Sequence, residues 1–393
     1  MKRLIAVIVV VGALTGCQSN TSKQDAHKQW FRARGQVLCE LGNEHFKAGQ
    51  LDDARGKALE ALKLNDELDE ARLLLGKVYL EQDRYLEAVN PLAAVTVHQP
   101  NLAEGWYLLA VAQERSDQPE QALASYTRAC ELDATNTDAI LARGEVLVAL
   151  GRIADARQAA ESAFTAHRTD PGLYEQAGRL AMMQEDYKAA AAYFQQAGDL
   201  DYRNLRYQES QALALLLGGQ YQRAAGILEQ ITRSADYRPS AWVHSTLGDC
   251  YLAMGRPDEA QDAYGRACDL DNRNPRSWCN AARASMEAGD FRRAAIAAGE
   301  ALRLESYHRD ASMLYGYALL REGQVEQALT FLRQACRAHP DSSDLHCLLG
   351  RAYEARGDPG AARRCYDQAA QMEPANTLAR QLLASADDVR TVR

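Results

Sequence analysis

Several features that would place the chain in other classes of protein are scarce or missing. The 393 residues include only 10 prolines, and the formal net charge is −8 with no long block of either sign. A nucleic-acid partner is not expected, because phosphate binding requires a basic face. The apolar run from Leu4 to Leu14 has 11 residues. A membrane-spanning helix needs about 20, so this run is too short to be one.

Catalytic and metal-binding motifs are missing as well. The sequence has no HExxH, no CxxC pair, no nucleophile elbow and no glycine-rich phosphate loop. Its eight histidines are scattered, and the adjacent His346 and Cys347 are too few for a zinc site, which needs three or four converging ligands. We therefore predict that the chain is not an enzyme and has no cofactor, no metal and no small-molecule substrate.

The first 17 residues have the three parts of a secretory signal. Lys2 and Arg3 precede the apolar run, and small residues then lead to Cys17. The stretch LTGC, residues 14–17, resembles the lipobox of bacterial lipoproteins. The resemblance implies cleavage after residue 16 and acyl chains such as palmitate on Cys17, which would give stable anchoring. The alternatives are an ordinary cleaved signal peptide and an uncleaved anchor.

The resemblance also implies a place in the cell. Because Gln18 rather than aspartate follows the cysteine, it implies a bacterial cell envelope protein, lipid-anchored in the outer membrane and facing the periplasm. We expect residues 17–34 to form a lipidated, flexible tether. Trp30 and Phe31 would pack on the first folded helix or, alternatively, lie at the membrane interface.

Small residues recur along the rest of the chain at intervals of 34, with one interval of 36 between Ala224 and Ala260. Counting from the start of each unit, position 8 is Gly42, Gly76, Ala110, Gly144, Gly178, Ala212, Gly248, Ala282, Gly316 and Gly350. Position 20 is alanine in every unit, from Ala54 to Ala362. Such an array is typical of stacked helical hairpins.

The turns of this expected hairpin are marked by glycine and proline. Position 15 is glycine in seven units, as at Gly49 and Gly323, where it would end the first helix in a left-handed conformation. Pro119, Pro257 and Pro359 occupy position 17, the first turn of the second helix, where a missing N–H costs nothing.

This pattern resembles the tetratricopeptide repeat (TPR), and Trp106 and Trp278 match its aromatic position 4. The resemblance implies an all-α fold, a right-handed α-α superhelical solenoid of about ten TPR hairpins over residues 35–376. The units are 35–68, 69–102, 103–136, 137–170, 171–204, 205–240, 241–274, 275–308, 309–342 and 343–376. The sixth departs from it, because Gln208 and Gln211 stand where apolar residues belong.

Two segments lie outside the regular 34-residue register, and their structures can also be predicted. Residues 377–393 are predicted to form a capping helix and tail, with one apolar stripe comprising Leu378, Leu382, Leu383, Ala386 and Val389. The two extra residues near Tyr237 are either a longer turn or a joint that divides the array into six and four units.

Two pairs of cysteines have the same spacing. Cys268 and Cys279, and likewise Cys336 and Cys347, join the second helix of one unit to the first helix of the next. Either pair forms a disulfide, if the geometry allows it, or all four are small buried thiols.

The resemblance implies that first helices line a concave face through positions 2, 5, 9, 12 and 13. Those residues would bind an amphipathic helix or extended peptide, or positions 5 and 12 would instead pack against neighbouring first helices. Flanking charges are Lys77, Glu145, Arg179, Asp249, Arg283 and Arg351. The candidate partner-binding residues are Leu73, Lys77, Leu80, Tyr107, Val111, Leu141, Val148, Arg179, Met182, Met183, Leu213, Leu216, Leu217, Leu252, Arg283, Met286, Met313, Tyr317 and Leu320.

Taken together, these features predict a non-enzymatic scaffold that binds another protein or peptide and is attached to the membrane through Cys17. The resemblance points to envelope assembly or secretion, as in TPR lipoproteins of pilus assembly, outer-membrane assembly and polysaccharide export. The alternatives are an adaptor that recruits a peptidoglycan hydrolase or protease, and an enzyme with a cryptic site.

Overall fold

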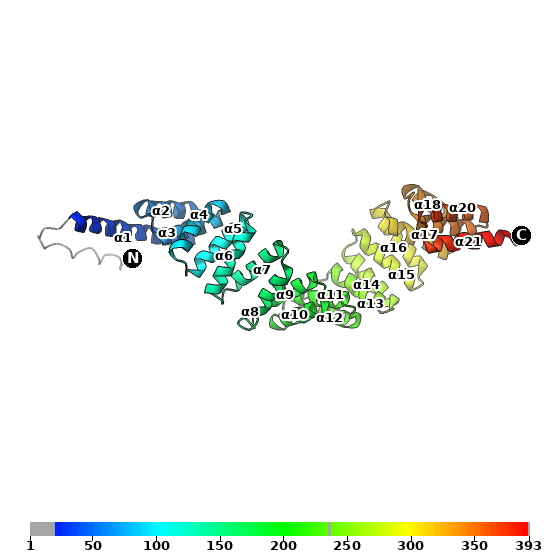
Figure 1. The fold of residues 1–393 in the computed structure, drawn as a ribbon. Coiled ribbons are helices and arrows are strands. Elements are labelled where there is room, and N and C mark those ends of the chain that lie inside the picture. Colours follow the sequence, from blue (N-terminus) through cyan, green and yellow to red (C-terminus); the bar gives the residue numbers. More distant parts are fainter. Residues whose placement is uncertain (1–19, 235–236, 392–393) are drawn as a thin grey trace. The chain divides into compact units, whose positions relative to one another are not determined.

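A computed structural model describes residues 20–234 and 237–391 of the chain. Every regular element in these two ranges is an α-helix, which confirms the predicted all-α class (Figure 1). The chain divides into two compact units, of which unit 1 ends at Leu180 and unit 2 begins at Ala181. Within the described residues, no helix combines the length and the apolar character needed to cross a bilayer.

The helices follow one another in antiparallel pairs. Unit 1 contains α1 (Asn20–Lys47), α2 (Leu51–Leu64), α3 (Asp69–Glu81), α4 (Tyr85–His98), α5 (Ala103–Arg115), α6 (Pro119–Leu132), α7 (Thr137–Ala149) and α8 (Ile153–Ala163). The division between the units falls inside α9 (Pro171–Met183). Unit 2 continues with α10 (Tyr187–Leu200), α11 (Leu205–Leu217), α12 (Tyr221–Arg233), α13 (Ala241–Ala253), α14 (Pro257–Leu270), α15 (Pro275–Glu287), α16 (Phe291–Leu304), α17 (Arg309–Arg321), α18 (Val325–Ala338), α19 (Ser343–Ala355), α20 (Pro359–Met372) and α21 (Thr377–Thr391).

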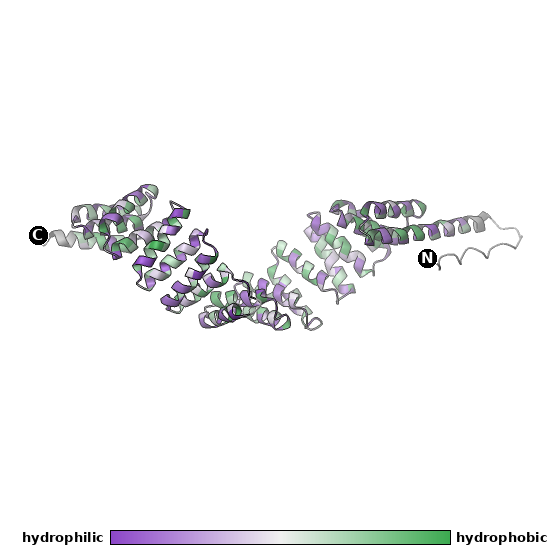
Figure 2. Cartoon of the chain, turned by 180° about the vertical axis from the view of Figure 1, so that it is seen from behind, coloured by the Kyte–Doolittle hydropathy of each residue, from purple (hydrophilic) through white to green (hydrophobic). Residues whose placement is uncertain are grey.

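Small residues at position 8 set how closely the two helices of a hairpin approach. A Cβ added to Gly76 would lie 2.4 Å from Leu92 Cδ2, and one added to Gly350 would lie 2.3 Å from Tyr366 Cε1. The alanines of position 20 are buried in all ten units. Larger apolar side chains fill the spaces between these contacts, so each helix carries both hydrophobic and hydrophilic residues (Figure 2).

The turn within each hairpin depends on one left-handed residue. All seven position-15 glycines have positive φ, for example 75° at Gly323. Asp83, Asp117 and Glu185 adopt the same conformation in units that lack the glycine. The backbone therefore keeps one turn geometry even where the side chain opposes it.

The two-residue insertion near Tyr237 does not divide the array, so the six-plus-four joint is wrong. One cluster of buried residues in unit 2 runs from Ala181 to Ala263 and includes Ile231 before the insertion and Val243 after it. The apolar core is therefore continuous past the insertion, and the boundary between units lies at Leu180 instead.

The expected tether is helical over most of its length. Helix α1 begins at Asn20, whereas a flexible segment was predicted for residues 17–34. Residues 20–34 contain neither glycine nor proline, so nothing in their sequence stops the first hairpin helix from extending backwards. Trp30 belongs to this helix and is 51% exposed, with its ring 5.1 Å from that of Phe31. Cys17, the predicted lipidation site, lies outside the described residues.

Helix α21 packs on the last hairpin. Ala379 is fully buried in a cluster with Cys347 and Ala369, and Leu382 packs against the same cluster. Leu378 is exposed, so the buried stripe begins one residue later than predicted. The side chain of Val389 lies outside the described part of the chain.

The cysteines of the hairpins are thiols. All eight, from Cys39 to Cys365, are free and buried in the structure, including both pairs for which a disulfide was considered. Burial raises the pKa of Cys268 and of Cys336 to about 12. These side chains therefore act as small apolar groups.

Candidate functional site

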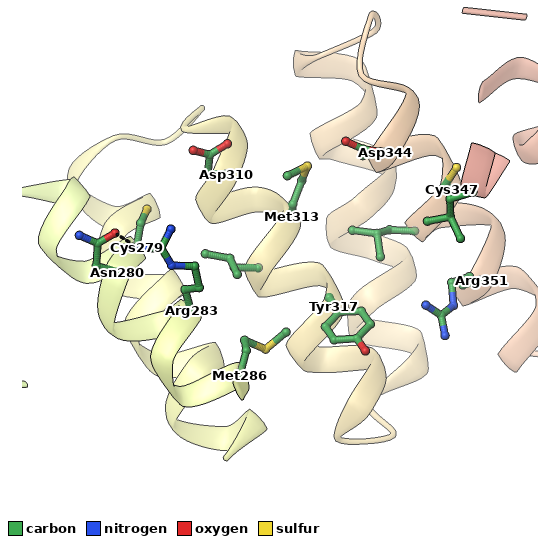
Figure 3. Close-up of a pocket in the computed structure, with 13 residues that line it drawn as sticks. Cys279, Asn280, Arg283, Met286, Asp310, Met313, Tyr317, Asp344, Cys347 and Arg351 are labelled. Carbon is green, nitrogen blue, oxygen red and sulfur yellow. Dashed lines mark hydrogen bonds between the residues drawn. The ribbon is translucent and has the colours of Figure 1, made fainter. Parts of the chain in front are cut away.

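A groove of about 420 Å³ lies along the first helices of the last three hairpins in unit 2 (Figure 3). Helices α15, α17 and α19 form its length, and the cap helix α21 closes one end through Leu378. It is lined by Cys279, Asn280, Arg283, Met286, Asp310, Met313, Leu314, Tyr317, Asp344, Cys347, Leu348, Arg351 and Leu378. We call this the C-terminal groove.

The floor of the C-terminal groove is apolar and adaptable. Met286, Met313 and Leu348 are partly exposed along it. Cys279 and Cys347 are buried between them, and burial, with a smaller effect of the nearby acidic groups, raises the pKa of each thiol to about 11. Flexible thioethers beside uncharged thiols suit a floor that accepts apolar side chains of different shapes.

Acidic residues lie along one edge of the groove. Asp310 and Asp344 are in the first turns of α17 and α19, so each stabilises the positive end of its own helix. Asn376 donates a hydrogen bond from Nδ2 to Asp344 Oδ1 at 3.1 Å. Met286 and Tyr317 lie toward the opposite edge (Figure 3).

Two basic residues line the groove: Arg351 lies two turns after Asp344 on α19, and Arg283 lies on α15. The guanidinium of Arg351 lies 5.7 Å from the centre of the Tyr317 ring and makes no ion pair with any described residue. Arg321 donates from Nη1 to the Tyr317 hydroxyl at 2.8 Å, which fixes the ring. Arg283 approaches Asp249 only to 4.0 Å. Of the two cations that line the groove, Arg351 is thus the one without an ion-pair partner among the described residues.

Four of the predicted residues meet in this groove, namely Arg283, Met286, Met313 and Tyr317. Leu320 is on α17 but does not line the groove, and the other predicted residues lie on first helices elsewhere; each of these residues is partly or fully exposed. Many also pack against core clusters, as Leu73 and Leu80 do in unit 1 and Leu216 and Leu252 in unit 2.

The sequence pattern named position 2 as part of the first-helix face, but Asp310 and Asp344 at that position were not among the candidate residues. Position 6, which supplies Leu314 and Leu348, was not predicted to line the face, and Leu378 comes from the cap helix. Aspartate is common in the first turn of helices, so the residue type alone does not indicate a binding site. The available indication was that aspartate recurs at position 2 in two adjacent units.

Charges on the first helices of unit 1 are mostly paired with each other. Lys77 Nζ lies 2.6 Å from Glu104 Oε1, and Arg179 Nη2 lies 2.8 Å from Glu145 Oε1. Each pair joins the first helices of adjacent hairpins. These predicted charges are therefore less available to a partner than Arg351.

The groove contains a cysteine–histidine contact that does not have the properties of a catalytic pair. Cys279 Sγ lies 3.8 Å from His308 Nδ1, and the same nitrogen accepts the backbone N–H of Ala311 at 3.3 Å. His308 therefore caps α17, and the raised pKa of Cys279 keeps its thiol protonated. No described residues form a group of three or more potential metal ligands.

Repeated antiparallel hairpins with an open groove on their first helices define a helical-repeat protein. The model of the tetratricopeptide repeat family matches residues 39–102, 73–139, 107–173, 141–197 and 175–239. Residues 245–373 match the middle TPR-like domain of cilia and flagella-associated protein 70. The chain belongs to the tetratricopeptide repeat family, as the sequence pattern predicted.

Individual relatives are distant. DnaJ homolog subfamily C member 7 of Homo sapiens is 24% identical over 235 residues, which are 48% of this chain and 47% of that protein. Superkiller complex protein 3 of Mus musculus is 22% identical over 373 residues, 80% of this chain and 24% of that protein. The chain thus spans about half or less of the length of these curated relatives.

Solved structures match the chain at low identity. A tetratricopeptide repeat protein from Parabacteroides merdae is 16% identical, with a TM-score of 0.44, over 64% of this chain and 98% of that one. The crystal structure described as YrrB, a TPR protein with an unusual peptide-binding site, is 17% identical, with a TM-score of 0.36, over 57% and 97% of the two chains.

Proposed function

We propose that the protein is a non-enzymatic scaffold whose C-terminal groove binds a segment of another protein. One observation carries the proposal: three consecutive first helices expose an apolar floor next to Arg351, a cation without an ion-pair partner among the described residues. An apolar groove of this kind suits an amphipathic helix or an extended peptide.

The charges of the groove define the chemistry of its occupant. Apolar side chains would lie against Met286, Met313 and Leu348, and an acidic side chain would pair with Arg351. A basic side chain on the opposite edge of the segment would lie near Asp310 and Asp344. The expected ligand is therefore a short segment with apolar residues against the floor, an acidic side chain toward Arg351 and a basic side chain toward the two aspartates.

Selection of random 12-residue peptides on the purified full-length chain tests this proposal. Selected peptides should combine apolar, acidic and basic residues in this way and should bind in fluorescence polarisation. Replacing Met313 by glutamate should weaken their binding by at least about tenfold, since it buries a charge against the apolar segment. The matched control is Ile296→Glu on α16, which is 60% exposed outside the groove and should leave binding unchanged. Equal peptide affinities of the Met313→Glu and Ile296→Glu variants would show that the C-terminal groove is not the binding site.

We also propose that the scaffold is held on the envelope membrane of a bacterium through acyl chains on Cys17, and acts there in assembly or secretion. The supporting observation is the sequence LTGC behind a short apolar run. Labelling cells with an alkyne analogue of palmitate should tag the protein, and Cys17→Ala should abolish the tag. A tag that persists in the variant would contradict the anchor.

A further inference from the structure

Grooves also occur on the side of the array formed by the second helices. Three of them lie between two successive second helices, with the first helix between them as the floor. In the groove between α14 and α16, the floor residues are Trp278, Ala281 and Ser285 of α15. The Trp278 indole donates to the carbonyl oxygen of Asn272 at 3.0 Å, so it is held in place by the turn before it.

The equivalent groove between α10 and α12 has a different floor. Gln208 and Gln211 of α11 replace the residues that correspond to Trp278 and Ala281. The cleft has a volume of about 530 Å³. It is lined by Gln195, Gly198, Asp199, Tyr202, Gln208, Gln211, Arg223, Gly226, Ile227 and Gln230. We call it the glutamine cleft.

Gln211 presents its amide oxygen to the cleft. Its side chain is 8% exposed, and its Nε2 donates one long hydrogen bond of 3.4 Å to Gln195 Oε1. Its Oε1 accepts no hydrogen bond from any described residue and is not among the fully buried atoms without a partner, so it remains reachable from the cleft. Leucine occupies this position in other units, as at Leu247 and Leu349, so the fold does not need the amide.

Two glycines keep the cleft open although neither is needed by the backbone. Gly198 and Gly226 lie inside helices and do not have positive φ. A Cβ added to Gly226 would meet nothing within 4 Å, and one added to Gly198 would be 3.6 Å from Tyr207 Cβ, an ordinary contact. Glycine in a helix interior costs about 1 kcal/mol relative to alanine. The cleft is thus open at a cost to stability that packing does not explain.

The lining chemistry indicates a neutral ligand rich in hydrogen-bonding groups. The one acidic residue, Asp199, is balanced by the one basic residue, Arg223, among the residues that line the cleft. Side-chain amides both donate and accept hydrogen bonds, as sugar hydroxyls do. Tyr202 is 69% exposed at the cleft, so its ring can cover the apolar face of a pyranose. We infer that the glutamine cleft is a saccharide-binding site.

This site is independent of the C-terminal groove, and its test uses different residues. The full-length chain is titrated with chitotetraose, cellotetraose, maltotetraose and mannotetraose, and binding is followed by saturation-transfer NMR and calorimetry. At least one of the four should bind. Gly226→Leu, which fills the cleft with a good helix former, should weaken that binding by at least about tenfold while raising the melting temperature.

A second variant and a matched control distinguish loss of saccharide binding from a general effect of the substitutions. The double substitution Gln208→Trp with Gln211→Leu restores the residue types of other units, and should also abolish binding without loss of stability. Gly265→Leu fills an equally open place in the groove between α14 and α16, and should leave binding unchanged. Failure of all four saccharides to bind, or equal binding by all variants, overturns the proposal. Binding of peptides instead, lost in the same two variants, would also overturn the saccharide assignment.

Discussion

At the scale of single residues, the fold depends on small residues at position 8, where a larger side chain would overlap the second helix of the same hairpin. Tyr366 is fully buried, and its hydroxyl donates to Glu354 Oε2 at 3.0 Å, so its ring cannot move away from position 8 of its hairpin. Gly350 faces that ring directly. The repeat register alone predicted this small residue, because every unit has glycine or alanine there.

Replacing Gly350 by alanine should therefore destabilise the protein. The added Cβ would overlap the Tyr366 ring, and overpacking of this kind costs about 1–3 kcal/mol. The same change at Gly265, where a Cβ meets nothing within 4 Å, should instead stabilise it by up to about 1 kcal/mol. Urea unfolding followed by circular dichroism measures both. Changes of the same sign in the two variants would contradict the packing described here.

His244 makes the stability of unit 2 depend on pH. Burial, and then the nearby positive charge of Arg266, lower the pKa of His244 below its usual value. In the unfolded chain the imidazole takes up a proton near pH 6.5, whereas in the folded chain it does so only at lower pH. Stability from this group is therefore present above about pH 6.5 and is lost as the pH falls below that value.

The measurement compares melting temperatures at about pH 7.5 and about pH 5.5. The wild-type midpoint should fall more than that of His244→Phe, which keeps a ring of similar size but cannot be protonated. Equal decreases in the two proteins would show that His244 does not titrate as its burial predicts.

At the scale of the element, the sequence predicted the hairpins well because their signals repeat. Gly323 with positive φ and Pro119 in the first turn of α6 are local features that need no tertiary information. The extent of α1 was not predictable in the same way. Residues 20–34 lack a stop signal, and polar composition alone suggested a tether where the chain continues the helix.

The cap helix α21 is an element with a protective role that can be measured. It covers Cys347, which is 1% exposed and lies in a cluster with Ala379. Deleting residues 377–393 should therefore expose this thiol and raise its rate of alkylation by iodoacetamide by about tenfold or more. Cys250, fully buried in α13, is the internal control and should keep its slow rate. An unchanged rate at Cys347 would mean that α21 does not cap the last hairpin.

At the scale of the whole molecule, the array repeats its backbone but not its surface. Arg179 and Glu145 neutralise each other in unit 1, while Arg351 in unit 2 has no such partner among the described residues. The repeat register predicted which positions line the first-helix face, including Met313 and Tyr317. It did not predict where along that face a groove forms, because this depends on side chains particular to three units and on Leu378 of the cap.

The central claim is that the C-terminal groove holds a segment of another protein. A photo-activated crosslinker in place of Met313 tests it most directly in the cells that produce the protein, with Ile296 as the matched exposed position outside the groove. The account predicts one identified protein attached at position 313 and not at 296, through a segment with apolar residues beside an acidic one. Arg351→Glu should remove that adduct. The same adducts at both positions, or an adduct at 313 that survives Arg351→Glu, would contradict it.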